Sequence, residues 1–203
     1  MHVRKPTIGV AAVLAVTLSL MGGQAVAAPS ATASSTVAPS AVADRAVAAR
    51  VVTYDASASA EFKAAVDRGA AVWNESVDAV ELRPVAAGQR ANIRILADNG
   101  WPRALPTTLG NGTVYIGRQA VVEGHDTIRI SAHELGHILG LPDIKPGPCT
   151  SLMSGSTAGT SCKNPYPDAV EKAEVEDNFG AELSRTDEAA RSEVARSNVV
   201  IVD

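Results

Sequence analysis

Residues 131–143 read SAHELGHILGLPD, in which His133 and His137 stand four positions apart with Glu134 between them. On an α-helix, side chains four residues apart lie one turn apart on the same face, so both imidazoles can reach one ion. In this H-E-x-x-H arrangement the histidines bind zinc and the glutamate acts as a base toward water. The stretch therefore predicts a helix that carries a metal site and a catalytic carboxylate.

The end of the same stretch offers a third ligand. Gly140 lies three residues after His137, where a helix can end in a left-handed turn that glycine adopts at little cost. Pro142 cannot continue the helix, so Asp143 is expected to swing back toward the ion. Two histidines and one aspartate leave a fourth position for water, which is the usual coordination of a catalytic zinc. The alternative is an ordinary helix with two surface histidines, and the glycine and aspartate at these offsets favour the metal site.

His125, eight residues before His133, is expected to lie outside this site. Eight residues span about two helical turns, which places its ring too far along the axis to share the ion. We expect this histidine to lie in a solvated loop or to cap the helix.

The first 27 residues have the layout of a secretory signal peptide. Arg4 and Lys5 precede an apolar run, and the sequence A-V-A at 25–27 supplies the small residues of a cleavage site. An uncleaved membrane anchor is the alternative, but the apolar run is short for a span of about 20 residues. Residues 28–49 are rich in Ala, Ser, Thr and Pro and read as a pro-segment or a flexible linker. We therefore expect a secreted, extracellular protein.

Cys149 and Cys162 are the only two cysteines of the chain. An oxidising compartment favours a disulfide between them. A zinc site built from this pair would need further cysteines or histidines close in sequence, and none lies nearby.

The formal net charge of −4 gives no basic footprint of the kind that nucleic-acid-binding proteins carry. We expect protein or peptide substrates, no nucleic acid, no stable membrane association once the signal is removed, and a monomer. Aromatic residues make up only 3% of the chain, so the core must be mostly aliphatic.

Residues 50–180 are expected to form one α+β domain. Alternating or β-branched apolar runs predict strands, and apolar residues spaced by three and four predict helices. The expected strands cover residues 50–55, 79–85, 91–98 and 113–117, and the expected helices cover 57–76, the quoted stretch and 167–179.

Residues 99–112 are rich in turn-forming residues, and Asn111-Gly112 is a strong turn signal. The strand at 113–117 can then lie on the edge of the sheet, where an extended substrate adds as a further strand. Residues 181–203 are charged, with few core-sized side chains, and read as a solvated helix or a frayed C-terminal tail.

Three segments, HELGHILGLPD, PGPCTSLMSG and CKNPYP, together resemble the snapalysins, which are small secreted bacterial neutral proteases of the metzincin clan. The resemblance runs from about Val51 to Phe179. It implies a zincin fold, with a twisted mixed sheet, an active-site helix, a second long helix and an irregular lower subdomain. It also implies that His133, His137 and Asp143 bind zinc.

By the same resemblance, Glu134 is the general base and Met153 forms a methionine turn beneath the site. Cys149 and Cys162 correspond to the disulfide of the family. Asp126 corresponds to an acidic ligand of a structural calcium, although Ile128 stands where the family has a threonine. A helix N-cap is the alternative role for Asp126.

Lys145 marks a departure from the family, whose ligand aspartate is soon followed by a tyrosine that helps to stabilise the tetrahedral intermediate. Lys145 either supplies a positive donor to the developing oxyanion or is a surface lysine. The sequence thus predicts a secreted zinc endopeptidase. The alternative is a secreted binding or inhibitory protein whose zinc site is structural or degenerate.

Overall fold

The computed structural model describes residues 48–197. The predicted signal peptide and all but the last two residues of the predicted pro-segment lie outside the described residues. The strands are β1 (Arg50–Ala58), β2 (Val80–Pro84), β3 (Ile93–Asp98), β4 (Arg103–Thr108) and β5 (Asn111–Gly117). The helices are α1 (Lys63–Asn74), α2 (Arg118–Val122), α3 (Thr127–Ile138) and α4 (Ala169–Ser197), with short 3-10 segments η1 (Ala60–Phe62) and η2 (Leu152–Ala158).

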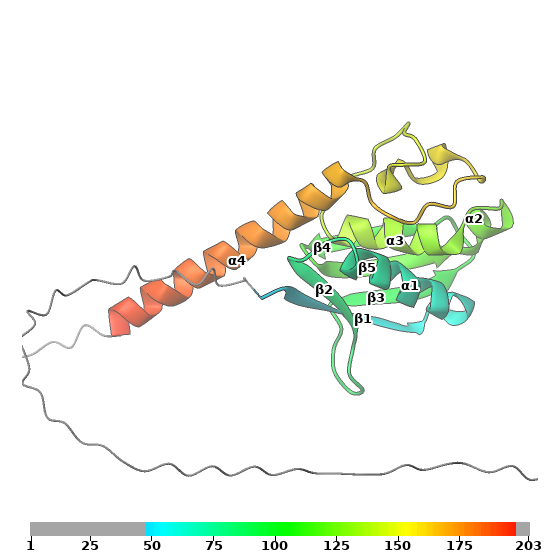
Figure 1. The fold of residues 1–203 in the computed structure, drawn as a ribbon. Helices are drawn as coiled ribbons and strands as arrows, with labels where there is room; N and C mark the ends of the chain where they lie inside the picture. The colour runs from blue at the N-terminus through cyan, green and yellow to red at the C-terminus, as the bar shows by residue number, and fades with distance from the viewer. Residues whose placement is uncertain (1–47, 198–203) are drawn as a thin grey trace, which may run out of the picture. The chain divides into compact units, whose positions relative to one another are not determined.

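The five strands form one twisted mixed sheet in the order β2-β1-β3-β5-β4 (Figure 1). Neighbouring strands are parallel except β4, which runs antiparallel to β5. Side chains alternate across the sheet, so Val52 is fully buried whereas its neighbour Val51 is 42% exposed. The predicted α+β class with a mixed sheet is confirmed.

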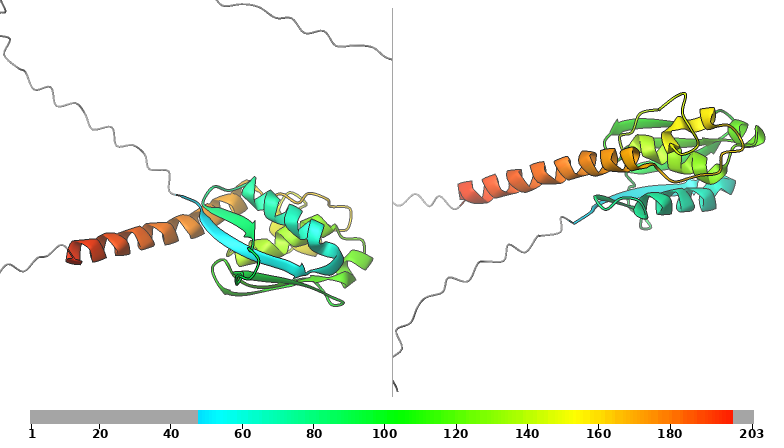
Figure 2. Two further views of the ribbon diagram at one scale, coloured as in Figure 1. Left: turned by 90° about the horizontal axis from the view of Figure 1, so that it is seen from below. Right: turned by 45° about the horizontal axis from the view of Figure 1, so that its top comes forward.

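Helices α1 and α3 pack against each other on one face of this sheet (Figures 1 and 2). They approach closely at Gly69, where an added Cβ would lie 2.9 Å from the backbone nitrogen of Ala132. One turn further along α1, the buried Trp73 donates from Nε1 to the Ala132 carbonyl at 2.8 Å. Because α1 is fixed to the backbone of α3 in this way, the helix that carries the histidines has a rigid support.

The prediction for residues 99–112 is wrong, because β4 lies within them. The prolines at 102 and 106 suggested turns, but an edge strand tolerates proline where the missing N–H would face solvent. The hairpin turn falls at Leu109 and Gly110, two residues before the predicted Asn111-Gly112. As a result, β5 lies inside the sheet, and β4 is its edge instead of residues 113–117.

Helix α4 runs without a break through residue 180, where the predicted tail begins (Figure 1). Its first turns pack on the domain through Val175 and Phe179, both fully buried. Side chains 184–193 are all exposed. The two predicted segments are therefore one helix with a packed start and a solvated continuation.

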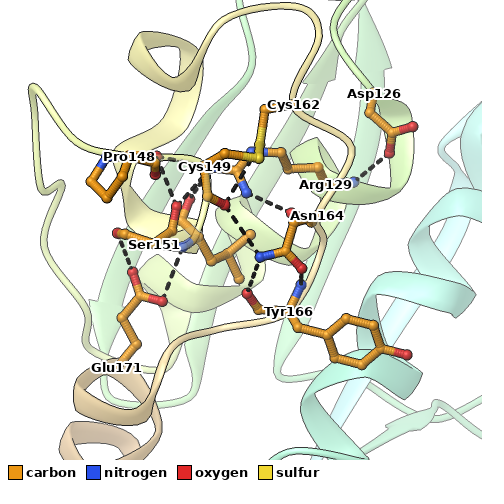
Figure 3. Close-up of a disulfide and its surroundings, with 11 residues drawn as sticks. Asp126, Arg129, Pro148, Cys149, Ser151, Cys162, Asn164, Tyr166 and Glu171 are labelled. Atoms are coloured by element: carbon orange, nitrogen blue, oxygen red, sulfur yellow. Dashed lines mark hydrogen bonds between the residues drawn. A yellow bond between two sulfur atoms is a disulfide. The ribbon is translucent and has the colours of Figure 1, made fainter.

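Residues 139–168 form the irregular lower part of the fold, in which η2 is the only helical segment. The predicted disulfide between Cys149 and Cys162 is present in it, with the two Cα atoms 5.5 Å apart (Figure 3). Between residues 48 and 197 there is no helix with the length and apolar character needed to cross a membrane.

Candidate active site

Helix α3 begins at Asp126, whose side chain caps it. Asp126 Oδ1 accepts hydrogen bonds from the backbone N–H groups of Ile128 at 3.1 Å and Arg129 at 2.9 Å. The structure thus shows the N-cap role. Within the described residues, the one group of three possible metal ligands does not include Asp126, and calcium binding there stays a prediction.

The end of α3 carries the chain back toward its own histidines. Gly140 has a φ of +98°, in the left-handed region, as its position in the sequence predicts. Its N–H donates to the carbonyl of His137 at 3.1 Å, and the N–H of Leu141 donates to that of Gly136 at 3.0 Å. This pair of bonds is the Schellman motif, which reverses the chain and brings Asp143 beneath the helix.

His133, His137 and Asp143 converge on one point. Asp143 Oδ1 lies 3.3 Å from His133 Nε2 and 3.4 Å from His137 Nε2. The ligand atoms of all three residues lie within 4.8 Å of one another. Ligand atoms that surround a tetrahedral zinc at about 2.0–2.1 Å stand about 3.3–3.4 Å apart, so the donor set fits this ion.

Backbone carbonyls select the nitrogen that each histidine presents. His133 Nδ1 lies 3.1 Å from the carbonyl oxygen of Leu152, and His137 Nδ1 lies 2.8 Å from that of Leu141. A carbonyl only accepts, so both Nδ1 atoms carry the proton and both Nε2 atoms offer a lone pair.

The electrostatics of the three residues also suit metal binding. Burial and the neighbouring His133 lower the pKa of His137, which keeps its ring neutral. Interaction with the neighbouring His133 and a hydrogen bond from Lys145 hold the pKa of the Asp143 carboxyl well below its ordinary value, so it is ionised. Neutral imidazole and ionised carboxylate are the forms that bind metal ions.

Glu134 lies beside this group in a cleft of about 710 Å³. The edge strand β4 lines one side through Arg103 and Ala104, and the lower segment lines the other through Lys145 and Gly155. Burial raises the pKa of Glu134 from 4.5 to about 7, against the opposing influence of His133. A carboxyl with such a pKa can take and release a proton near neutral pH.

Met153 is fully buried directly under α3. A Cβ added to Gly136 would lie 2.8 Å from Met153 Sδ and 3.0 Å from the Trp73 ring. Gly136 stands between the two histidines in sequence, so the methionine packs immediately behind them. The assignment of Met153 to a methionine turn stays a prediction.

Lys145 extends toward the ligand group. Its Nζ donates to Asp143 Oδ2 at 2.9 Å, whereas the other oxygen of this carboxylate faces the histidines. Gly155 leaves room for the lysine, since a Cβ there would lie 2.9 Å from Lys145 Cε and 3.2 Å from His133 Cε1. Lys145 is therefore a partner of the aspartate at the cleft and differs from an isolated surface lysine.

His125 lies apart from the three ligands, as expected, and its ring meets Trp101 edge-on at 5.8 Å between centroids. Sequence reasoning missed two buried charges next to the site, Arg129 and Glu171. Arg129 stands four residues before His133, on the same helix face, which was an available signal. No comparable signal connects Glu171 to the site.

The family described as "Streptomyces extracellular neutral proteinase (M7) family" matches residues 49–181 of this sequence. The chain belongs to this M7 family. The predicted resemblance to the snapalysins and the prediction of a metallopeptidase are therefore confirmed.

Similar proteins include the extracellular small neutral protease of Streptomyces caespitosus, 42% identical over 125 residues that cover 61% of this chain and 92% of that protein. The extracellular small neutral protease of Streptomyces lividans is 39% identical over 127 residues, again 61% of this chain but only 54% of the relative. Among solved structures, archaemetzincin from Methanopyrus kandleri matches 68% of this chain and 99% of its own, with 14% identity and a TM-score of 0.43.

Proposed function

We propose that the protein is a secreted, zinc-dependent endopeptidase that hydrolyses peptide bonds of extracellular proteins. The observation that carries the proposal is the convergence of two histidine Nε2 atoms and one aspartate oxygen beside a buried glutamate. Membership of a family of extracellular neutral proteinases supports the same conclusion.

In this proposal His133, His137 and Asp143 hold the zinc. When bound, zinc supplies a Lewis acid that activates water and polarises the scissile carbonyl. Glu134 accepts the proton of the attacking water and then delivers it to the leaving amine. Its raised pKa suits both steps, because the carboxylate must gain and lose one proton in each turnover.

The substrate is proposed to lie extended along β4, as an added strand of the sheet. This corrects the expectation for residues 113–117, since β4 is the edge that lines the cleft. Pro102 and Pro106 have no N–H, and successive N–H groups of a strand point to opposite edges. The donor for a substrate backbone that lies between the two prolines on the free edge is therefore the N–H of Ala104.

Secretion is supported by the names of the relatives, which are called extracellular, and by the signal-like N-terminus. The disulfide in the lower segment suits an oxidising compartment.

The test compares casein hydrolysis by wild type, Glu134→Ala and His137→Ala, with zinc content measured for each purified protein. We expect Glu134→Ala to keep its zinc and lose about 10²–10⁴-fold in kcat/KM, because only the proton transfer is removed. His137→Ala should lose both zinc and activity, as should wild type treated with a chelator. Full activity of Glu134→Ala, or of zinc-free wild type, would overturn the mechanism.

The presence of Lys145 in place of the family tyrosine favours the second candidate, a binding or inhibitory protein with a structural or degenerate zinc site. A wild-type protein that binds zinc tightly and hydrolyses no protein substrate would support it. A purely structural site has no use for a base, whereas Glu134 borders an open cleft.

A further inference from the structure

Glu171, in the first turn of α4, is a carboxylate almost wholly withdrawn from solvent, with 1% of its surface exposed. It accepts four hydrogen bonds, from Ser151 Oγ at 2.6 Å and from the backbone N–H groups of Asp168, Leu152 and Met153 at 2.7–3.0 Å. Three of the four come from residues 151–153, which pass beneath α3.

The backbone of Leu152 connects this carboxylate to the candidate metal site. Its N–H donates to Glu171 Oε2 at 3.0 Å, and its carbonyl oxygen lies 3.1 Å from His133 Nδ1. The side chain of the next residue, Met153, packs behind the histidines. Glu171 thus holds both Leu152, whose carbonyl orients the His133 ring, and Met153, which packs behind both histidines.

Arg129 of α3 binds the backbone carbonyl groups of the same segment. Its Nη2 donates to the carbonyl oxygen of Ser151 at 2.7 Å, to that of Leu152 at 3.3 Å and to Ser154 Oγ at 2.9 Å. Figure 3 shows Glu171 and Arg129 reaching the segment around Ser151 from different helices. Glu171 therefore accepts from the N–H groups of the segment, and Arg129 donates to its carbonyl groups.

We propose that Glu171 is a positioning residue of the metal centre. It raises the affinity of the site for zinc by fixing the Leu152 carbonyl against His133. Helix α4 thereby takes part in metal binding although none of the three proposed ligands lies on it. The inference rests on the proposed zinc site. Groups that hydrogen-bond to ligand histidines commonly change metal affinity by about 10–100-fold when they are removed.

A purely local role explains only part of this arrangement. Asp168 and Glu171 form a capping box, because Asp168 Oδ1 accepts from the Glu171 N–H at 2.9 Å and Glu171 accepts in return. That accounts for one of the four bonds that Glu171 accepts. The other three bind the segment that carries Leu152 and Met153.

Glu176 provides a matched control on the same helix. Its carboxylate also accepts two backbone N–H groups, those of Asp78 and Ala79, in the loop before β2. These contacts lie on a part of the fold that holds none of the three proposed ligands. Glu176→Gln therefore removes a similar charge from α4 and spares the segment beneath the site.

The experiment measures zinc affinity of wild type, Glu171→Gln and Glu176→Gln by competition with a chromophoric chelator. It is run at a temperature at which circular dichroism shows each metal-free protein to be folded. We expect Glu171→Gln to weaken zinc binding about tenfold and to change the visible absorption spectrum of the cobalt-substituted protein. Glu176→Gln should leave affinity and spectrum as in wild type, even where it lowers the melting temperature.

Equal zinc affinity and equal cobalt spectra in Glu171→Gln and wild type would overturn the inference. If Glu171→Gln does not fold, Glu171→Asp replaces it, because this variant keeps the charge and withdraws the carboxylate by one methylene group. Its zinc affinity must also fall, and an unchanged value would overturn the inference. A wild-type protein that binds no zinc would instead refute the proposed function, and the inference with it.

Discussion

At the scale of single residues, the candidate site depends on which atom of each polar side chain faces which partner. The Nδ1 atoms of His133 and His137 face backbone carbonyls, which leaves the Nε2 atoms for a metal. Asp143 presents Oδ1 to the histidines and Oδ2 to Lys145. Glu134 is the exception, because it is buried beside the cleft and burial is the strongest influence on its pKa.

The pH dependence of hydrolysis follows from Glu134. Burial raises its pKa from 4.5 to about 7, and the positive charge of a bound zinc moves it back down. Only the ionised carboxylate can accept a proton, so kcat/KM should fall as the pH drops through this pKa. We expect the midpoint of the acid limb to lie between 4.5 and about 7, measured with a fluorogenic peptide and zinc-saturated enzyme.

Zinc content measured at each pH is the control, because protonation of the histidine ligands also releases metal. An acid limb that coincides with zinc loss, or one centred well above 7, would contradict the assignment to Glu134.

At the scale of elements, the turn after α3 and the edge strand β4 shape the site. The Schellman motif at Gly140 returns the chain to its own helix within a few residues. The antiparallel β4 lines the cleft and leaves one of its own edges unpaired. The helix end therefore completes the proposed ligand set, and the edge strand offers the surface on which a peptide can lie.

Gly140→Ala tests the turn. Alanine at a φ of +98° is strained, and its Cβ would lie 2.7 Å from Asn178 Nδ2. We expect the free energy of unfolding to fall by about 1–3 kcal/mol in urea denaturation. Zinc affinity should fall as well, because Asp143 depends on this turn.

Gly180→Ala in α4 is the matched control. Nothing lies within 4 Å of a Cβ added there, and alanine favours a helix, so stability should rise by about 0.5–1 kcal/mol. A Gly140→Ala protein as stable as wild type would show that the left-handed turn is not required.

At the scale of the whole molecule, the buried residues that the structure describes in α4 lie in its first turns. Glu171, Val175 and Phe179 are buried, whereas the described side chains beyond residue 183 are exposed. The family match also ends at residue 181. The packed start of α4 therefore belongs to the catalytic fold, whereas residues 184–193 lie outside the core.

Ending the chain at Ala181 should leave the described domain intact. We expect the free energy of unfolding to change by no more than about 0.5 kcal/mol, because the removed side chains that the structure describes, at residues 184–193, are all exposed. Phe179→Ala is the comparison and should cost about 3–5 kcal/mol, since the ring is fully buried. Thermal unfolding of both proteins measures the difference, and a large loss on truncation would assign a structural role to the solvated part of α4.

The sequence by itself determined the features that depend on neighbours along the chain. The spacing of His133, Glu134 and His137, the left-handed turn at Gly140 and the start of α4 near Asp168 follow from helical periodicity and from the local chemistry of helix ends. The short motif also contains Asp143, so the whole candidate ligand set could be named without coordinates.

Only the tertiary structure decided which distant segments meet. The carbonyl of Leu152 against His133 and the contact of Glu171 with that segment join residues that are 18 or more positions apart. The place of β4 at the edge follows from the pairing of β5 with β3 on its other side. Backbone carbonyl and N–H groups are chemically alike along the chain. The sequence therefore does not indicate which of them form hydrogen bonds with distant side chains such as His133 and Glu171. The fold alone brings them into reach, because packing of the sheet, α3 and α4 fixes their relative positions.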